Sequence, residues 1–366
     1  MADKRRVIIL FGGRSAEHEV SILSARNVCA ALDRDRFEPV LVGIDKQGRW
    51  LSADETALLA ASGDPRQLTL HASGPELPVP VRPVAAAEVG PLLRHDDVVF
   101  PVLHGTYGED GTVQGLLELA DVAYVGPGHL GSAIGMDKEV SKRLLAQAGV
   151  PVVPWRTVHA VDHRRDPERT ARLGAELGYP LFVKPANAGS SVGVSKVRGP
   201  EQLAAAVELA LSFDTKCLLE QAVDAREIEC AVLGNDDPQA SRPGEIIVHH
   251  ADGFYSYAAK YVDADASYWQ IPAEITPEQE ATVRRLAVET FRALELAGMA
   301  RVDFFLDRAT GELLVNEVNT IPGFTAISMY PKMWEAAGVP VRDLVTRLVE
   351  LAIARRAARR ALKTSL

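Results

Sequence analysis

The segment FVKPANAGSSVGVSKV, residues 182–197, constrains the fold more than any other part of the sequence. Its small residues would let backbone N–H groups approach phosphate oxygens, as phosphate-binding loops do. In a Walker-type loop, however, the lysine closes the glycine run and a helix follows. Here Lys184 precedes the glycines, and the residues from Val192 to Val197 alternate as a strand does. We therefore expect a glycine-rich loop between two strands, which is unlike a Walker-type P-loop.

The length and charge of the chain narrow the classes of protein that could carry such a loop. A chain of 366 residues is long enough for roughly two to three domains and a substantial core. Its net charge of −9 argues against a nucleic-acid partner, because nucleic-acid-binding proteins usually carry a basic excess. The basic segment ARRAARRALK near the C-terminus is expected to be a solvated helix end rather than a membrane or nucleic-acid patch.

The cysteines and apolar runs favour a cytoplasmic protein. Cys29, Cys217 and Cys230 are scattered without CxxC spacing, as expected for reduced thiols. The apolar stretch at residues 7–11 is too short for a signal sequence. No apolar run approaches the ~18 residues of a membrane helix, so we expect no membrane partner.

The first third of the chain alternates strand and helix patterns, which predicts an α/β fold with a parallel sheet and helices on both faces. The proline-rich residues 63–91 are expected to form an irregular surface insertion. The predicted strands are 5–13, 37–45 and 96–105, and the predicted helices are 15–32 and 112–122.

From Ser132 the pattern changes to pairs of strands separated by helices, which is typical of mainly antiparallel α+β sheets. One continuous helix is predicted over residues 132–150. TPEQ at 276–279 is a capping box with proline at the first helical position, and it predicts a helix to about Leu296. The predicted strands here are 151–158, 179–186, 192–197, 216–223, 226–234, 299–307 and 311–319.

The last two of these strands carry the most polar pattern. Because side chains two apart share a face of a strand, Arg301 and Asp303 point one way and their apolar neighbours the other. A hairpin centred on Thr310 would place Asp303 opposite Glu317 and Arg301 opposite Asn319. One face would then carry Arg, Asp, Glu and Asn together.

Such an oxygen-rich face has two interpretations. Mg²⁺ accepts a few carboxylates and completes its shell with phosphate oxygens and water, so this face could hold a phosphate-bridging metal. Charged strand faces are also common as solvated surfaces carrying one ion pair. The glycine-rich loop elsewhere in the same region favours the metal site.

Several motifs, read in order, are similar to those of the ATP-grasp superfamily and, more narrowly, of the D-alanine–D-alanine ligase family. The similarity extends from about Val7 to Leu351, which makes it far more specific than a single glycine pattern. The motifs are FGGRSAEHEVSILSA, HGTYGEDGTVQGLLE, MDK at 136–138, the 182–197 loop, EQAVDAREIECAVLG, ARVDFFLD and LLVNEVNTIPGF.

This resemblance implies a domain organisation. It comprises an N-terminal α/β substrate domain (1–131), an ATP-grasp central subdomain (132–223) and an ATP-grasp C-terminal subdomain (224–366). ATP would lie between two antiparallel sheets, with the 184–197 hairpin as a lid over its phosphates. An ω-loop at about 252–272 would close over the substrates and exclude water.

The resemblance also implies the residues of the nucleotide site. Lys138 and Lys184 would neutralise the α- and β-phosphates, and Lys260 would reach the γ-phosphate. Glu227 would accept the ribose hydroxyls. The adenine linker would be Glu220, Gln221, Ala222 and Val223, and the ligands of two Mg²⁺ ions, replaceable by Mn²⁺, would be Asp303, Glu317 and Asn319.

For the reaction, the resemblance implies two steps that make D-alanyl-D-alanine for peptidoglycan. The carboxylate of one D-alanine attacks the γ-phosphate to give an acyl phosphate, and the amine of a second D-alanine then displaces phosphate. Preorganised donors typically contribute about 2.7–4 kcal/mol each to such a step. The implied residues are Glu17 for the first ammonium, Arg301 and the Gly323 N–H for the tetrahedral intermediate, Ser328 and Met329 for the second carboxylate, and a network of His104, Ser190 and Tyr261.

Plainer interpretations of single residues stay open. Glu17 could be a first-turn acid stabilised by the helix dipole. His104 could be a hydrogen-bonded histidine at a strand end, Tyr261 a packed loop aromatic, and Ser190 a turn residue.

Three other functions are alternatives to a D-alanine–D-alanine ligase. One is another ATP-grasp carboxylate–amine ligase, such as a D-alanine–D-lactate ligase. The D-lactate enzyme is disfavoured because relatives that use D-lactate usually lack a tyrosine at the position of Tyr261. A non-catalytic sensor on the same scaffold is disfavoured because the metal and phosphate positions are chemically competent. A Rossmann dehydrogenase is disfavoured because Gly12-Gly13 lacks the GxGxxG spacing. Relatives are commonly dimers, so a homodimer is expected.

Overall fold

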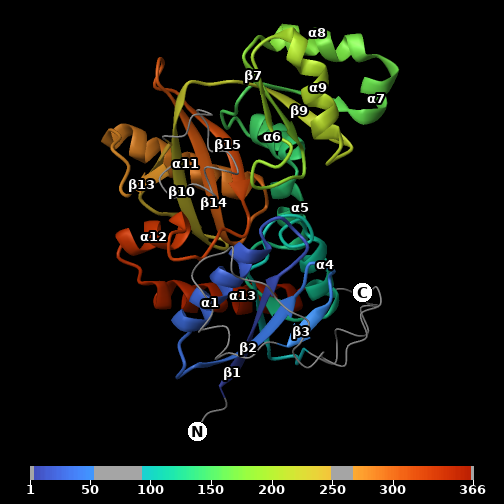
Figure 1. The fold of residues 1–366 in the computed structure, drawn as a ribbon. Helices are drawn as coiled ribbons and strands as arrows, with labels where there is room; N and C mark the ends of the chain where they lie inside the picture. The colour runs from blue at the N-terminus through green and yellow to red at the C-terminus, as the bar shows by residue number, and fades with distance from the viewer. Residues whose placement is uncertain (1–3, 53–92, 249–266, 364–366) are drawn as a thin grey trace.

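The computed structural model describes residues 4–52, 93–248 and 267–363, in which three sheets follow one another along the chain (Figure 1). The expected insertion at 63–91 lies outside the described residues, and so does most of the expected ω-loop at 252–272. Within the described ranges, no helix is both long and apolar enough to cross a bilayer.

The N-terminal sheet has the strand order β3-β2-β1-β4-β5. β1 pairs in parallel with β2 and β4, and β5 continues the parallel arrangement beside β4. Alternate residues of β1 face opposite sides, so Ile9 packs in one cluster with α1 and Ile8 in another with α4. The predicted parallel sheet with helices on both faces is confirmed, and β3 adds an unpredicted antiparallel edge. The elements are β1 (Arg5–Gly12), α1 (His18–Ala31), β2 (Phe37–Ile44), β3 (Trp50–Ser52), β4 (Val98–Pro101), α4 (Thr112–Leu119) and β5 (Ala123–Tyr124).

The second sheet is antiparallel throughout, with the order β6-β9-β7-β8. Leu181 and Val183 of β7 are fully buried against α9, so one face of the sheet is covered by helix. β7 and β8 flank the glycine-rich loop and pair antiparallel, which confirms the predicted strand–loop–strand arrangement. The elements are β6 (Trp155–His159), α7 (Ala160–Arg165), α8 (Pro167–Leu177), β7 (Leu181–Pro185), β8 (Ser195–Val197), α9 (Pro200–Leu211) and β9 (Lys216–Gln221).

The third sheet has the order β13-β12-β10-β14-β15, with β11 paired to β10, and its pairings are antiparallel. The capping box is confirmed, because the Thr276 hydroxyl accepts a hydrogen bond from the Gln279 N–H at 3.2 Å. Helix α11 ends at Ala293 rather than at the predicted Leu296, since Glu295 has a φ of +54° that stops the helix. The elements are β10 (Ala225–Gly234), β11 (Gln239–Ala240), β12 (Gly244–Val248), β13 (Ser267–Gln270), α11 (Pro277–Ala293), β14 (Gly298–Asp307) and β15 (Leu313–Asn319).

Strand β14 separates apolar from charged side chains with a period of two. Val302 and Phe304 are buried in the cluster formed with α11, while Arg301 and Asp303 face away from it. The predicted register is confirmed at the charged end, where Arg301 pairs with Asn319 and Asp303 with Glu317. The register then shifts by one residue, because Asn316 is an extra residue in a β-bulge.

The continuous helix predicted over residues 132–150 is wrong. The structure has two helices, α5 (His129–Met136) and α6 (Lys138–Gln147), separated at Asp137. Asp137 has an extended ψ of 98°, and its carboxylate accepts hydrogen bonds from the N–H groups of Glu139 and Val140 at 3.2 and 3.1 Å. An N-cap aspartate therefore restarts the helix within the apolar pattern.

Of the two C-terminal helices, α12 (Met329–Ala336) packs against β10 of the third sheet, and α13 (Val341–Arg360) returns to the N-terminal sheet (Figure 1). Residues of α13 such as Leu348 share one buried cluster with Val7 of β1. The Arg355 guanidinium lies 4.3 Å from the Tyr124 ring centroid, and Arg356 pairs with Asp121 at 3.2 Å. The basic segment is therefore not simply solvated as expected, because its first half packs on the edge of this sheet.

The close packing of α5 yields a stability prediction. A Cβ on Gly131 would lie 2.4 Å from the carbonyl oxygen of Glu295, so Gly131→Ala should force the two segments apart. We expect a loss of about 1–3 kcal/mol in the free energy of unfolding. Gly115 in α4 is a matched control with no atom within 4 Å of its Cβ position. Gly115→Ala should instead stabilise by about 0.5–1 kcal/mol. Denaturant unfolding measures both, and equal shifts would contradict the close approach.

Candidate active site

A cavity lies between the second and third sheets. Its walls come from β7, β9 and the glycine-rich loop on one side and from β10, β14 and β15 on the other. The predicted site residues that line it are Lys138, Lys184, Ser190, Glu220, Gln221, Val223, Glu227, Arg301, Asp303 and Glu317. The two-sheet arrangement expected for a nucleotide site is thus present around these side chains.

Two lysines share one carboxylate at the inner end of this cavity. Lys184 Nζ lies 2.6 Å from Glu220 Oε2, and Lys142 Nζ lies 3.3 Å from Glu220 Oε1. Burial would raise the pKa of Glu220, but the two ammonium groups outweigh it and hold that pKa below its usual value. Burial lowers the pKa of Lys142 to about 8, although Glu220 opposes the shift.

The segment after Glu220 crosses the cavity wall with much of its backbone already bonded. The N–H of Gln221 donates to the carbonyl of Pro154 at 3.0 Å, and the N–H of Ala222 donates to the carbonyl of Pro180 at 3.1 Å. Gln221 and Val223 line the cavity, as does Glu227 at the start of β10. Ala222 belongs to the linker but is not among the lining residues.

The charged face of β14 and β15 forms the opposite wall. The Arg301 guanidinium donates to both oxygens of Asp303 at 2.7 Å and lies 3.1 Å from Glu229. The Asn319 side-chain amide also donates to Asp303, at 2.9 Å. Burial lowers the pKa of Arg301, but Asp303 and Glu229 raise it well above its usual value, so the guanidinium stays charged.

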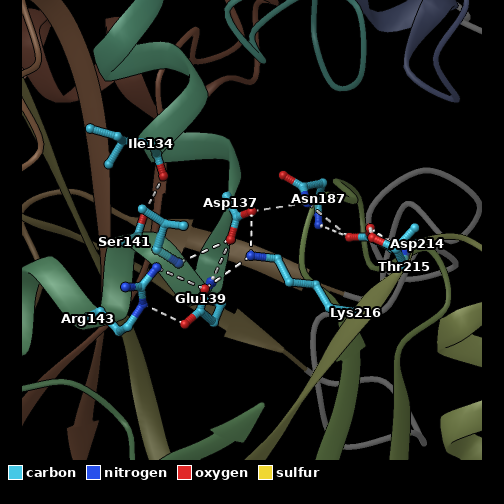
Figure 2. A network of polar contacts seen from close by, with 10 residues as sticks. Ile134, Asp137, Glu139, Ser141, Arg143, Asn187, Asp214, Thr215 and Lys216 are labelled. Carbon is cyan, nitrogen blue, oxygen red and sulfur yellow. Dashed lines mark hydrogen bonds and ion pairs between the residues drawn. The ribbon is translucent and has the colours of Figure 1, made fainter. Parts of the chain in front are cut away.

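The base of the glycine-rich loop is held by a network of polar contacts (Figure 2). The Asn187 side chain donates to Asp137 at 3.3 Å and to Asp214 at 3.0 Å. Lys216 bridges Asp137 and Glu139 at 2.8 and 3.1 Å. The start of α6 and β9 thereby anchor the loop on both sides (Figure 2).

Lys138 and the two loop serines complete this region. Lys138 Nζ donates to the carbonyl of Ala188 at 2.8 Å and lies 3.7 Å from Glu317. Ser190 and Ser191 have φ values of +49° and +58°, which residues other than glycine seldom adopt. Strained backbone of this kind often occurs at ligand-binding sites.

A second cavity adjoins the first and shares Lys138, Ser190, Glu229, Arg301 and Glu317 with it. Its remaining walls come from the start of α1, from the segment after β4 and from the end of α5. The others come from β12, β13, β15 and the segment that leads from β15 into α12. The other predicted site residues that line it are Glu17, His104, Asn319, Gly323, Ser328 and Met329. Three distant parts of the chain therefore meet where the two cavities join.

Glu17 and His104 differ in how they meet this cavity. Glu17 directly precedes α1 without making a side-chain cap, and its Oε2 would lie 3.3 Å from a Cβ on Gly189. His104 is 5% exposed, and its ring nitrogens contact the carbonyl of Ile321 at 2.9 Å and the hydroxyl of Ser24 at 3.2 Å. Glu17 thus lies at the N-cap position of α1 without a side-chain bond to the helix, and His104 is a hydrogen-bonded histidine that also borders the cavity.

The far end of the second cavity is formed by the start of α12. Ser328 is the N-cap residue, and its hydroxyl oxygen accepts a hydrogen bond from the Thr325 N–H at 2.9 Å. Met329 is 4% exposed with its side chain in the core, so only its backbone is placed to meet a ligand. A Cβ on Gly323 would lie 2.8 Å from the Ser328 hydroxyl oxygen. Exposed N–H groups at a helix start favour an anionic partner.

Several residues of the site were not predicted from the sequence. Glu109 is buried in the second cavity, where it accepts hydrogen bonds from the N–H groups of Gly105 and Ile321 at 2.8 and 3.1 Å. Burial, with Glu17 nearby, raises its pKa. Glu229 could have been found, because it shares a face of β10 with Glu227. No sequence signal identifies Lys142. Lys260 and Tyr261 lie outside the described residues.

The charged face also bears on metal binding. Across the described ranges, no group of three His, Cys, Asp or Glu side chains is arranged to hold an ion. Asp303, Glu317 and Asn319 nevertheless bring two carboxylates and an amide to neighbouring positions, which is a donor set that suits Mg²⁺ once phosphate and water complete its shell. The oxygens of Asp303 accept hydrogen bonds from Arg301 and Asn319.

The chain matches two family profiles that together span most of its length. Residues 6–127 match the "D-ala D-ala ligase N-terminus" family, and residues 144–350 match the "D-ala D-ala ligase C-terminus" family. Among curated proteins, it is 50% identical to D-alanine–D-alanine ligase A of Escherichia coli K12, over 100% of both chains. It is 47% identical to D-alanine–D-alanine ligase of Shouchella clausii, over 99% of this chain and 98% of the other.

Solved structures agree with these sequence matches. The D-alanine–D-alanine ligase from Coxiella burnetii is 35% identical, with a TM-score of 0.77 over 98% of this chain and 97% of the other. The VanG D-Ala:D-Ser ligase from Enterococcus faecalis is 33% identical, with a TM-score of 0.79 over 96% of this chain and 100% of the other. The chain therefore belongs to the D-alanine–D-alanine ligase family and has its ATP-grasp fold.

Proposed function

We propose that the chain joins two D-alanines into D-alanyl-D-alanine for peptidoglycan precursors, with conversion of ATP to ADP and phosphate. The observation that carries this proposal is the junction of the two cavities at Lys138, Ser190, Arg301 and Glu317. Phosphates at the end of the first cavity would meet a carboxylate bound in the second. Full-length identity of 50% to a D-alanine–D-alanine ligase supports the same reaction.

In the first cavity, we assign the nucleotide contacts to the residues on its two walls. Lys138 and Lys184 are suited to the α- and β-phosphates, because both ammonium groups lie at the cavity surface. Glu227 is suited to the ribose, and the linker from Glu220 to Val223 to the adenine. We also expect Lys260 to reach the γ-phosphate.

In the second cavity, the first D-alanine would place its ammonium near Glu17 and its carboxylate toward the phosphates. That carboxylate oxygen attacks the γ-phosphorus, ADP leaves, and an acyl phosphate forms. The neutral amine of the second D-alanine, held by its carboxylate at Ser328 and Met329, attacks the carbonyl carbon, and phosphate leaves. Arg301 and the Gly323 N–H would stabilise the negative charge that develops on the carbonyl oxygen. His104, Ser190 and Tyr261 would orient these groups.

The metal would be held by Asp303, Glu317 and Asn319. Two Mg²⁺ ions are proposed, with Mn²⁺ able to substitute, and they would neutralise the charge of the phosphates. Because Asp303 is bonded to Arg301 and Asn319 in this structure, metal binding would compete with those contacts.

The organisation of the molecule is also proposed. The three sheets fall within the units 1–131, 132–223 and 224–366, one sheet in each. We further propose a cytoplasmic homodimer, since ATP is a cytoplasmic substrate and relatives are commonly dimers.

The identity of the second substrate has alternatives. A D-alanine–D-lactate ligase has the same architecture and remains the second candidate. The similarity to a D-Ala:D-Ser ligase structure adds D-serine as a nucleophile to be tested. Both differ from the main proposal only in what the second cavity accepts.

The substrate assignment is tested by phosphate release from ATP. Each D- and L-amino acid is offered alone and in pairs, together with D-lactate, and the products are identified by mass. We expect the fastest release with D-alanine alone and a D-alanyl-D-alanine product. Faster release with D-lactate or D-serine as the second substrate would overturn the assignment.

Gly323→Ala tests the second subsite. Its Cβ would displace the Ser328 hydroxyl, which lies 2.8 Å from that position. Loss of a hydrogen bond to a charged group costs about 1.5–3 kcal/mol, so kcat/KM for D-alanine should fall roughly 10–150-fold. ATP binding should not change, and Gly115→Ala should behave as wild type. An unaltered KM for D-alanine would place the second carboxylate elsewhere.

Glu317→Gln and Asn319→Ala test the metal assignment. Metal coordination of phosphates contributes several kcal/mol, so ligation should fall at least about a hundredfold. The melting temperature should be retained, because both side chains face the cavity rather than the core. Glu312→Gln changes an exposed carboxylate of the same hairpin and is the matched control. Near wild-type ligation at saturating Mg²⁺ in either variant would contradict the proposal.

A further inference from the structure

The Lys142–Glu220–Lys184 cluster contains one carboxylate and two ammonium groups in a largely buried setting. Glu220 is 2% exposed, so its charge depends on these cations. Removing the only partner of a buried charge is strongly destabilising. With two cations present, however, one can leave without isolating the carboxylate.

The two lysines differ in what else they can reach. Lys184 is at the cavity surface, where it also lies 3.4 Å from the side-chain oxygen of Asn316. Lys142 is 2% exposed and lies behind Glu220, where it contacts the carbonyl of Val153 at 3.5 Å and lies 6.0 Å from the Trp155 ring centroid. In the described part of the chain Lys142 does not line either of the two cavities, whereas Lys184 lines the first.

We propose that Lys142 is a positioning residue, a resident counter-ion for Glu220 that allows Lys184 to exchange the Glu220 carboxylate for a nucleotide phosphate. Lys184 holds Glu220 at 2.6 Å, closer than Lys142 at 3.3 Å. When a phosphate draws Lys184 away, Lys142 keeps the carboxylate paired. Without Lys142, a phosphate would have to compete with the buried Glu220 carboxylate for Lys184, because no other cation in the described ranges pairs with Glu220. This inference rests on the proposed ATP-binding role of Lys184.

The charged groups that face Lys142 are Glu220 and Lys184, with Glu317 farther away. Burial lowers the pKa of Lys142 to about 8, which is within an accessible range. Above that pH Lys142 becomes neutral and Lys184 is the remaining cation on Glu220. The affinity for ATP should therefore fall as the pH rises through about 8.

Lys142→Met tests this role because it removes the charge and keeps a similar volume. Calorimetry with Mg-ATP and with adenosine, which has no phosphate, separates the exchange from simple damage to the adenine site. We expect the Kd for ATP to rise at least about tenfold and the Kd for adenosine to change less than about twofold. The fall in ATP affinity around pH 8 should be absent from the variant. Lys46→Met, which breaks an exposed pair with Glu19, is the control and should bind both ligands as wild type.

A double-mutant cycle with Glu220→Gln provides a second measurement. With a neutral side chain at position 220, no buried anion needs a counter-ion, so adding Lys142→Met should not weaken ATP binding further. Equal weakening in both backgrounds, an equal loss of adenosine affinity, or wild-type ATP affinity in Lys142→Met would each overturn the inference. Failure of the wild-type protein to bind Mg-ATP would overturn the proposed function as well, and the two failures are thereby distinguished.

Discussion

The burial of the apolar face of β14 is the constraint on which the site depends. Val302, Phe304 and Leu306 are at most 3% exposed, and burying each such side chain contributes about 1.5–3 kcal/mol. Because strand side chains alternate, this burial also decides where Arg301 and Asp303 point. A slip of one residue would bring charge into the core, so the position of the charged face is secured by hydrophobic packing on its reverse side.

The charged groups of the site are paired with one another. Arg301 is paired with Asp303 and Glu229, and Lys184 is paired with Glu220. Partly desolvated charges are costly unless paired, which explains why the charged side chains within each wall pair with one another. Ligand binding is then an exchange of partners, and its free energy is a difference between two sets of ionic contacts.

Much of the fold followed from local patterns. The strand–loop–strand arrangement around Lys184 and the pairing of Asp303 with Glu317 were predicted, because period-two alternation and turn residues are local signals. The division of the 132–150 helix at Asp137 was missed, since an aspartate within a helical pattern resembles any exposed residue until its hydrogen bonds are seen.

The candidate site was predicted mainly through the order of its motifs, and its chemistry only in part. Glu109 and Lys142 depend on neighbours from distant segments, so no local spacing identifies them. The same holds for the Arg355 contact with Tyr124, which a composition-based view of the basic tail could not reveal. Long-range burial, rather than residue type, gives these side chains their properties.

The shared core of α13 and the N-terminal sheet bears on how the chain is made. Val7, Phe100, Leu344 and Leu348 pack in one cluster. The ribosome synthesises Val7 and Phe100 early and adds Leu344 and Leu348 more than two hundred residues later. Until then this face of the sheet lacks part of its apolar cover and exposes a surface prone to association. Burial of this face of the first sheet during biosynthesis therefore waits for α13, the last helix described, and the yield of folded protein should depend on protection of the nascent chain.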